Sequence, residues 1–508
     1  MYNLVVSKKN RFFVIENINK KDIAMKRLNF IFLLTILMSM TGIYAYAYDI
    51  AVENTDGVTM YYNYVKDGTE LEVTGKFIGT YENIKSYQGD IVIPEEVTIE
   101  NKTLKVTAIG EKAFYYCYDL TSINIPYSVT SIGEGAFHWC TGLISVVIPN
   151  SVTSIHSSAF SSCLNMTSIT IPNSVTTIGE KAFLSCTSLS SIKLPESLTT
   201  IADYLFDNCS NLTSITIPKS VSSIGENPFR YCKLSSIIVE EGNLNYHSNN
   251  NCNAIIETST NKLIIGCNNT IIPNDVTEIG KYAFQYCSDM TAITIPNSVR
   301  YIDDYSFEGC KGLTSITLPN NVTSIGYLAF RDCSGLTSVT IPNSLKSIGI
   351  NAFYGCKNLT SLTLSNSLTS IGRWAFYGCS RLESVIIPHS VTQLGEKAFY
   401  ECTKLTTVIS QIKEPFAISI TFSASVYDNA TLYVPSGTKE KYKATSGWWG
   451  FKNIVENDLL YIDDGQFVDT ENDIVNVYDL NGHRITSPQR GVNIVRLKDG
   501  TVRKVLVK

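Results

Sequence analysis

Histidine is scarce in this chain, and its few copies stand far apart. Only five occur among 508 residues. The sequence also contains neither the Gly-x-Ser-x-Gly turn of many hydrolases nor the His-Glu-x-x-His helix of zinc proteases. We therefore expect no enzymatic activity and no cofactor. The histidines are His138, His156, His247, His389 and His483.

A long apolar run is missing as well. The best candidate, Phe30 to Met38, falls well short of the ~20 apolar residues that span a bilayer. A basic pair precedes it and a small-x-small triplet follows, which is typical of a secretory signal peptide cleaved between Ala47 and Tyr48. Met25 is then the natural start of the leader. Residues 1–24 are either a long polar lead-in or the result of a wrongly chosen start codon.

Positive charge is in short supply once that leader is removed. Charged residues make up 17% of the full chain, whose formal net charge is -5. Residues 1–47 contain seven Lys or Arg and two Asp or Glu, so the mature chain has a net charge of -10. An acidic protein is poorly suited to nucleic acid or to anionic membrane surfaces. We expect no nucleic-acid partner, and membrane association only through export or surface anchoring.

Closely paired cysteines are absent, although cysteine itself is abundant. Twelve of the fourteen cysteines recur every 23 residues in two trains. Zinc sites need Cys-x-x-Cys pairs and histidines, which this spacing does not provide, so we expect no metal site. A fixed period of this size instead predicts a solenoid of stacked coils. The repeat cysteines are Cys117, Cys140, Cys163, Cys186, Cys209, Cys232, Cys287, Cys310, Cys333, Cys356, Cys379 and Cys402.

A phenylalanine precedes each repeat cysteine by three residues, as Phe330 precedes Cys333. This is the spacing of neighbours on one helical face, so the pair predicts a buried corner in each coil. Equivalent atoms in stacked coils lie about 4.8 Å apart or more, whereas the Cβ atoms of a disulfide lie ~3.8 Å apart. We therefore expect the repeat cysteines to be free, buried thiols that act as small hydrophobic side chains.

Each coil also contains a strand pattern. From Leu212 to Pro218 apolar and polar residues alternate until a proline ends the run, which predicts a short β-strand. A turn follows, and then the Ala-Phe-x-x-Cys segment, for which we expect one or two helical turns. One strand and one short helical turn per 23 residues is typical of a leucine-rich-repeat solenoid, here expected to be a right-handed superhelix.

The limits of the repeat divide the mature chain. Residues 48–105 have strand patterns without the repeat, and we expect them to form an N-terminal β cap. The solenoid covers 106–411, and a C-terminal cap covers 412–456. An acidic linker, 457–472, leads to residues 473–508, whose β-type runs and turns predict a small β domain.

Between the two cysteine trains the period is interrupted. Two short β-type runs around Thr258-Ser259-Thr260-Asn261 predict a hairpin inserted at 250–268. If its turn is symmetric, Cys252 lies directly opposite Cys267. These two cysteines are therefore the best candidates for a disulfide.

The repeat resembles that of a known family. The pattern Leu-x-x-Ile-x-Ile-Pro-x-Ser-Val-x-x-Ile-Gly-x-x-Ala-Phe-x-x-Cys is similar to the repeat of BspA-like leucine-rich-repeat surface proteins over residues 106–411. The resemblance implies adhesion to host or matrix proteins, such as fibronectin or fibrinogen, or to other cells. The tail, with Val477-Tyr478-Asp479-Leu480-Asn481-Gly482 and a closing Lys504 to Lys508, resembles the sorting domain of type IX secretion substrates, although Val492 and Asn493 stand where that family usually has an aromatic residue.

Outward positions of the repeat strands form polar columns. One interpretation is that threonine suits exposed strands and the hydroxyls merely hydrogen-bond along the sheet. The other is a shallow binding face for an extended protein or glycan, in which many weak contacts add up. Aromatic residues beside the cysteines, such as Tyr354, Trp374 and Tyr377, form a second repeated row, which packing between coils largely explains. The face is represented by Thr170, Thr216, Thr294, Thr317, Thr340, Thr363, Ser214, Ser315 and Ser338.

Taken together, these features predict a secreted or bacterial outer-surface binding protein without enzymatic activity. Its partner is an extracellular protein or glycan. A glycan-binding module for polysaccharide capture and a structural envelope protein without a specific ligand are the alternatives.

Overall fold

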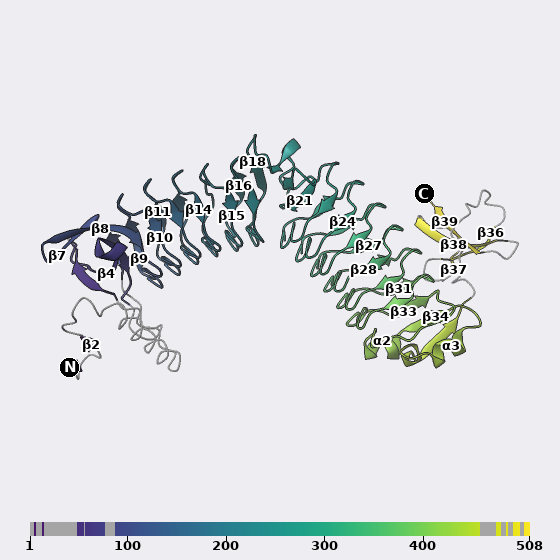
Figure 1. Cartoon of the computed structure of the whole chain (residues 1–508). Coiled ribbons are helices and arrows are strands. Elements are labelled where there is room, and N and C mark those ends of the chain that lie inside the picture. The colour runs from purple at the N-terminus through teal and green to yellow at the C-terminus, as the bar shows by residue number, and fades with distance from the viewer. Residues whose placement is uncertain are drawn as a thin grey trace.

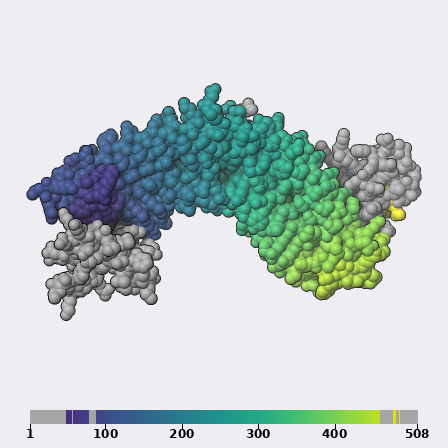
Figure 2. Space-filling model, viewed as in Figure 1, coloured from purple at the N-terminus to yellow at the C-terminus, as the bar shows by residue number. Residues whose placement is uncertain are grey.

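The coils stack into a long arc (Figures 1 and 2). The structure, a computed structural model, describes residues 48–54, 56–76 and 87–457, together with short strands near both ends of the chain. Strand-rich caps lie at the two ends of the arc, and the inserted hairpin lies near its middle. The arc is thus divided into two runs of coils that correspond to the two cysteine trains.

Each regular coil has three sides, two of which are parallel β-sheets. Along the first sheet, Ser338 of β27 (Ser338–Thr340) pairs with Ser361 of β29 (Ser361–Thr363) one coil later. Its other strands, before the C-terminal cap, are β6 (Gly89–Val92), β9 (Leu120–Asn124), β11 (Ser145–Val147), β13 (Ser168–Thr170), β16 (Ser214–Ile217), β18 (Ser236–Val239), β23 (Ala292–Thr294), β25 (Ser315–Thr317) and β31 (Ser384–Ile387).

The second sheet follows the proline turn and consists of shorter strands. There β28 (Ser347–Ile348) pairs with β30 (Ser370–Ile371) in the same one-coil register. The strand prediction for the repeat is confirmed. The other strands of this side are β10 (Ser131–Ile132), β12 (Ser154–Ile155), β14 (Thr177–Ile178), β15 (Thr200–Ile201), β17 (Ser223–Ile224), β22 (Glu278–Ile279), β24 (Tyr301–Ile302), β26 (Ser324–Ile325) and β32 (Gln393–Leu394).

The third side, here called the turn side, holds the Ala-Phe-x-x-Cys segment. It is built from turns rather than from a regular helix. Backbone N–H groups alternate between carbonyls three residues back, as from Cys140 to Phe137 at 3.1 Å, and carbonyls of the next coil, as from Phe137 to Ala159 at 2.7 Å. Two positions per coil have left-handed φ angles, for example Gly135 at 57° and Trp139 at 63°. The expected helical turn does not form, because alternate backbone N–H groups of the segment bond carbonyls of the next coil instead.

Stacked phenylalanines fill the centre of the solenoid. The rings of Phe307 and Phe330 lie 5.1 Å apart and nearly parallel. One stack runs from Phe114 to Phe229 and another from Phe284 to Phe422. These rings are buried, and offset aromatic stacking adds to the apolar area that each coil removes from water.

An antiparallel sheet closes the N-terminal end. β3 (Ile50–Glu53), β4 (Thr59–Val65) and β5 (Glu70–Thr74) pair antiparallel, with a 3₁₀ turn at Lys66–Gly68. β5 then pairs parallel with β8 (Lys102–Ile109), which also pairs antiparallel with β7 (Glu96–Ile99) and begins the second sheet of the solenoid. The cap therefore covers the open end of the core without interrupting the sheet.

The inserted hairpin forms at the predicted place, but its register shifts. β20 (Ile255–Glu257) and β21 (Lys262–Ile265) are antiparallel, and β19 (Tyr246–His247) pairs with β20 after a 3₁₀ turn at Asn249–Asn251. Ile256 lies opposite Leu263, as a symmetric turn requires, whereas Ile255 lies opposite Ile265 because a bulge intervenes.

This bulge affects the predicted disulfide. Cys252 and Cys267 are both buried and both free thiols, not bonded to each other. The Cys267 thiol instead donates to the carbonyl of Asn253 at 3.3 Å. The symmetric register on which the pairing depended ends at Ile256, so the predicted disulfide is not realised.

The C-terminal cap extends the first sheet. β33 (Thr407–Ser410), β34 (Thr431–Val434) and β35 (Asn453–Glu456) continue it in parallel beyond β31. α2 (Ala424–Asn429), α3 (Lys439–Ala444) and a 3₁₀ turn at Trp448–Gly450 connect these strands. Trp448 is fully buried beneath them, so the cap shields the last coil from water.

The tail forms a separate small sheet. β36 (Ile474–Tyr478), β37 (Arg484–Ile485), β38 (Gly491–Leu497) and β39 (Val502–Val507) pair antiparallel in the order β37-β36-β38-β39. The expected β-rich tail is thus present. Near the other end of the chain, β1 (Val5–Val6) pairs with β2 (Phe13–Val14).

Several predictions fall outside the described residues. They include the apolar part of the leader, Ala47 at the cleavage site, and residues 458–472 of the linker. In the stretches that the structure does describe, no helix is long and apolar enough to cross a membrane.

Candidate binding surfaces

The polar columns predicted on the strands lie on the exposed side of the first sheet. All nine representative serines and threonines named above are exposed, and they alternate with largely buried residues such as Ile316 and Val339. The alternation follows from the two-residue period of a strand, which points successive side chains to opposite faces. The outward orientation predicted for these residues is therefore correct.

The columns are continuous only in the second run of coils. Thr294 pairs with Thr317, and Thr340 with Thr363, on the four-stranded sheet β23-β25-β27-β29. In the first run the neighbours change. Thr170 pairs with Val147 and Thr216 with Ile238, and both of these apolar side chains are more than half exposed. We call the four-stranded surface formed by Ala292–Thr294, Ser315–Thr317, Ser338–Thr340 and Ser361–Thr363 the hydroxyl face.

The threonine hydroxyls on these coils fall into two groups, one that hydrogen-bonds to the preceding coil and one that does not. Thr337 Oγ1 donates to the carbonyl of Thr314 at 3.1 Å, and Thr360 Oγ1 donates to the carbonyl of Thr337 at 3.2 Å. These threonines lie just before the strands and tie successive coils together. The predicted columns differ: among the described residues, Thr317, Thr340 and Thr363 make no side-chain hydrogen bond. Their hydroxyls remain available to a partner.

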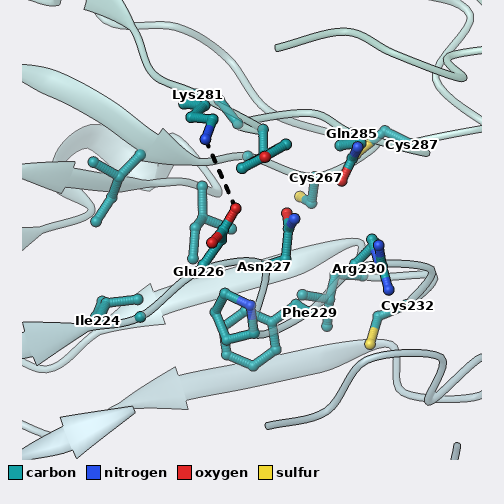
Figure 3. Close-up of a pocket in the computed structure, with 18 of the residues that line it drawn as sticks. Ile224, Glu226, Asn227, Phe229, Arg230, Cys232, Cys267, Lys281, Gln285 and Cys287 are labelled. Carbon is teal, nitrogen blue, oxygen red and sulfur yellow. Dashed lines mark ion pairs between the residues drawn. The ribbon is translucent and has the colours of Figure 1, made fainter. Parts of the chain in front are cut away.

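A cavity of about 370 Å³ opens where the two runs of coils meet (Figure 3). Phe229, Arg230 and Cys232 border it from the first run, and Lys281 and Gln285 from the second. In the part of the chain that the structure describes, no ring contact joins the two phenylalanine stacks across this gap. The cavity therefore marks the place where the hairpin replaces a regular coil.

Polar contacts bridge this junction. Lys281 Nζ lies 3.8 Å from Glu226 Oε1 (Figure 3). The rings of Tyr231 and Tyr286 stack at 4.1 Å. The Oε1 atom of Gln285 is buried without a hydrogen-bond partner. Both signs of charge line the cavity, and no group of three or more potential metal ligands occurs among the residues described. Its residues therefore select no ligand class.

A family model for the BspA-type leucine-rich repeat region matches six copies, over residues 107–236, 254–349 and 325–415. These ranges cover more than half of the chain. The chain belongs to the BspA-type leucine-rich-repeat family.

Solved structures agree with this family assignment. A leucine-rich cell surface protein from Faecalibacterium prausnitzii is 29% identical, with a TM-score of 0.54, and the match covers 72% of this chain and 96% of that one. A leucine-rich-repeat protein from Bacteroides ovatus is 25% identical, with a TM-score of 0.51, covering 81% of this chain and 100% of that one. No curated protein sequence gives a significant match. These relatives are leucine-rich-repeat proteins, a kind of fold that is not itself enzymatic.

The turn side of this chain carries residues that the repeat pattern did not single out. Tyr354 and Tyr377 stack at 4.8 Å, which agrees with packing between coils as the explanation of the aromatic row. Beside them lie Arg331, Asn351 and Lys397, in a groove that also includes Trp374. These three have no common residue type. Asn351 and Lys397 occupy the place of Trp374 in the coils before and after it, and Arg331 occupies the place of Tyr354 one coil earlier, so only a comparison of equivalent places would have indicated that they meet.

Proposed function

We propose that the protein is an exported surface or secreted protein that binds an extracellular protein through the hydroxyl face. The observation that carries the proposal is the run of exposed, unbonded threonine hydroxyls at Thr294, Thr317, Thr340 and Thr363. Such a flat, regular surface suits an extended partner that makes many weak contacts along several coils. The cell-surface naming of the Faecalibacterium prausnitzii relative supports the location. Host or matrix proteins are the partners to test first.

Lysine substitutions test the face directly. Immobilised fibronectin and fibrinogen serve as probes for the full mature chain and for the triple variant Thr317→Lys, Thr340→Lys and Thr363→Lys. Three adjacent lysines add bulk and repulsive charge to the middle of the face, so we expect affinity to fall at least tenfold. The matched control is Ser324→Lys, Ser347→Lys and Gln393→Lys, which adds the same charge to exposed positions of the second sheet.

The affinities of the face variant and the control variant distinguish the hypotheses. Loss only in the face variant supports the proposal. Equal loss in both variants means that charge rather than the face controls binding, and unchanged affinity in the face variant rejects the face. If neither probe nor a panel of host extracts gives saturable binding, the structural-envelope alternative is favoured.

Export has its own tests. N-terminal sequencing of protein recovered outside the cytoplasm should begin at Tyr48 if the leader is cleaved as predicted. Deletion of residues 473–508 should leave the protein in the periplasm if the tail is a sorting domain. Normal surface display of the truncated chain would reject that role for the tail.

A further inference from the structure

We propose that a groove on the turn side of the second run of coils binds an acidic saccharide, one that bears a carboxylate. The groove has a volume of about 370 Å³, within the range of small-ligand sites. It lies on a different side of the coil from the hydroxyl face, so its function is separate from the one proposed above.

Asn351 contributes a buried polar atom without a partner to the groove. The residue is only 7% exposed, its φ is 57°, and its Oδ1 atom is buried with no hydrogen-bond partner. Leaving a buried polar atom unpaired is unfavourable. Turn geometry does not require an amide here, because the equivalent position is Gly135 and Ser158 in earlier coils, with similar φ. A hydroxyl group of a bound ligand would supply the missing donor.

The aromatic wall of the groove favours a negative ligand. Tyr354 and Tyr377 are nearly parallel, at 3°, and the guanidinium of Arg331 lies 5.5 Å above the ring of Tyr354. Tyr377 also stacks on Tyr400 at 5.8 Å, so neighbouring rings and the cation cover the faces of both tyrosines. A ligand beside these stacked rings would therefore meet their edges, which carry the positive part of the quadrupole.

Two cations complete the lining, and no carboxylate residue contributes to it. Arg331 forms ion pairs through Nη1 with Glu308 and through Nε with Asp332. A guanidinium has five N–H donors, so the remaining ones are open to another acceptor. Lys397 Nζ lies 4.0 Å from its neighbour Glu396, a distance too long for a hydrogen bond. Both cations can therefore pair with a ligand carboxylate.

A saccharide fits these groups better than a peptide strand does. The backbone N–H groups along this side already bond the next coil, as from Asn351 to the carbonyl of Arg373 at 3.0 Å and from Asp332 to the carbonyl of Tyr354 at 2.7 Å. The turn side thus has no free edge on which a peptide could add a strand. What remains are side-chain donors and an amide, which match the hydroxyls and carboxylate of an acidic sugar.

Titration calorimetry on the full mature chain tests the proposal. The probe is a hexasaccharide of alternating glucuronate and N-acetylglucosamine, and its carboxyl-reduced form is the matched ligand. We expect the acidic form to bind at least fivefold more tightly, and its affinity to fall with added salt because part of the attraction is electrostatic. Lys397→Met, Trp374→Ala and Asn351→Gly should each weaken it at least fivefold; the last keeps the left-handed backbone accessible.

Tyr204→Ala is the control variant. Tyr204 occupies the position equivalent to Trp374 in the first run of coils, with φ 55°, and lies away from the groove. Equal loss in this variant, equal affinity for both hexasaccharides, or no binding would each overturn the proposal. Hexaglutamate that binds as tightly, with the same dependence on Lys397 and Trp374, would replace the saccharide with an acidic peptide. Unchanged circular dichroism of each variant ensures that the comparison concerns folded protein.

Discussion

The thiol of Cys333 donates a hydrogen bond to the backbone carbonyl of Phe307 in an earlier coil, across an S-to-O distance of 3.1 Å. The same bond recurs 26 residues apart in both runs, for example from Cys140 to Phe114 at 3.0 Å and from Cys379 to Phe353 at 3.5 Å. The cysteine therefore does more than fill space. It adds a second hydrogen bond to a buried carbonyl that already accepts the backbone N–H of Cys310 at 3.2 Å, and so ties one coil to the next.

Replacing this thiol should destabilise the solenoid. Cys333→Ala removes the donor and leaves a small void, and we expect a loss of about 1–2 kcal/mol in the free energy of unfolding. Cys333→Ser keeps a donor and should lose less. Urea unfolding followed by circular dichroism measures both. The comparison is Cys287→Ala: Cys287 begins the second train and, within the described residues, donates no such bond. A larger loss at Cys287 than at Cys333 would contradict this role of the bond.

All fourteen cysteines should titrate as free thiols in denatured, unreduced protein. In the folded protein we expect slow reaction at neutral pH, because burial raises the pKa of Cys163 and of Cys402 to about 12 and so suppresses the reactive thiolate. Burial raises the pKa of Cys232 and of Cys287 too, but these two beside the junction are partly exposed, so a reagent can reach them and they should react first. A denatured count of twelve would instead indicate a bridge between two of the cysteines.

Replacing Ser158, a residue with a left-handed backbone conformation, by glycine should increase the stability of the protein. Ser158 has a φ of 56°, at the position where Gly135 stands one coil earlier with a φ of 57°. A side chain in this conformation destabilises the folded state by roughly 1–2 kcal/mol. Glycine removes that strain, but it loses more backbone entropy on folding, which offsets about 0.5–1 kcal/mol of the gain. Ser158→Gly should therefore stabilise the protein by about 0.5–1 kcal/mol in urea unfolding. Ser158→Val, with a β-branched side chain, should destabilise it. A stable valine variant would show that this position relaxes without strain.

Stability should fall in mild acid because of His138. Its ring stacks on Tyr115 at 5.2 Å, and its pKa is lowered by burial and, to a lesser degree, by the positive charge of Lys112. The unfolded chain, with a histidine pKa of about 6.5, then binds the proton more readily than the folded chain does. The contribution of His138 is thus complete above pH 6.5 and is lost as the pH falls below it. His138→Phe keeps a ring and removes the titration, so its melting temperature should decline less between pH 7 and pH 5.

The local sequence pattern was sufficient to predict the structure where the same residue types recur in every coil. The cysteine spacing located the coils, and the alternation around Ser338 and Thr340 placed their side chains outward. The pattern was insufficient where several coils or an irregular step decide the outcome. Phe330 and Cys333 have helical spacing, yet bonds to the next coil open that segment into turns. A bulge beside Ile255 moves the hairpin out of the register that would align Cys252 with Cys267.

The sequence by itself determined the period, the sheets, the buried phenylalanines and the family, because each depends on a pattern repeated within one coil. Only the tertiary structure decided which side chains meet across coils. It made the hydroxyl column continuous in one run and interrupted it with Val147 and Ile238 in the other. It also brought Asn351, Trp374 and Lys397 into one groove. The physical reason is that neighbours in a solenoid are one coil apart, so a surface depends on combinations of residues some 23 positions apart.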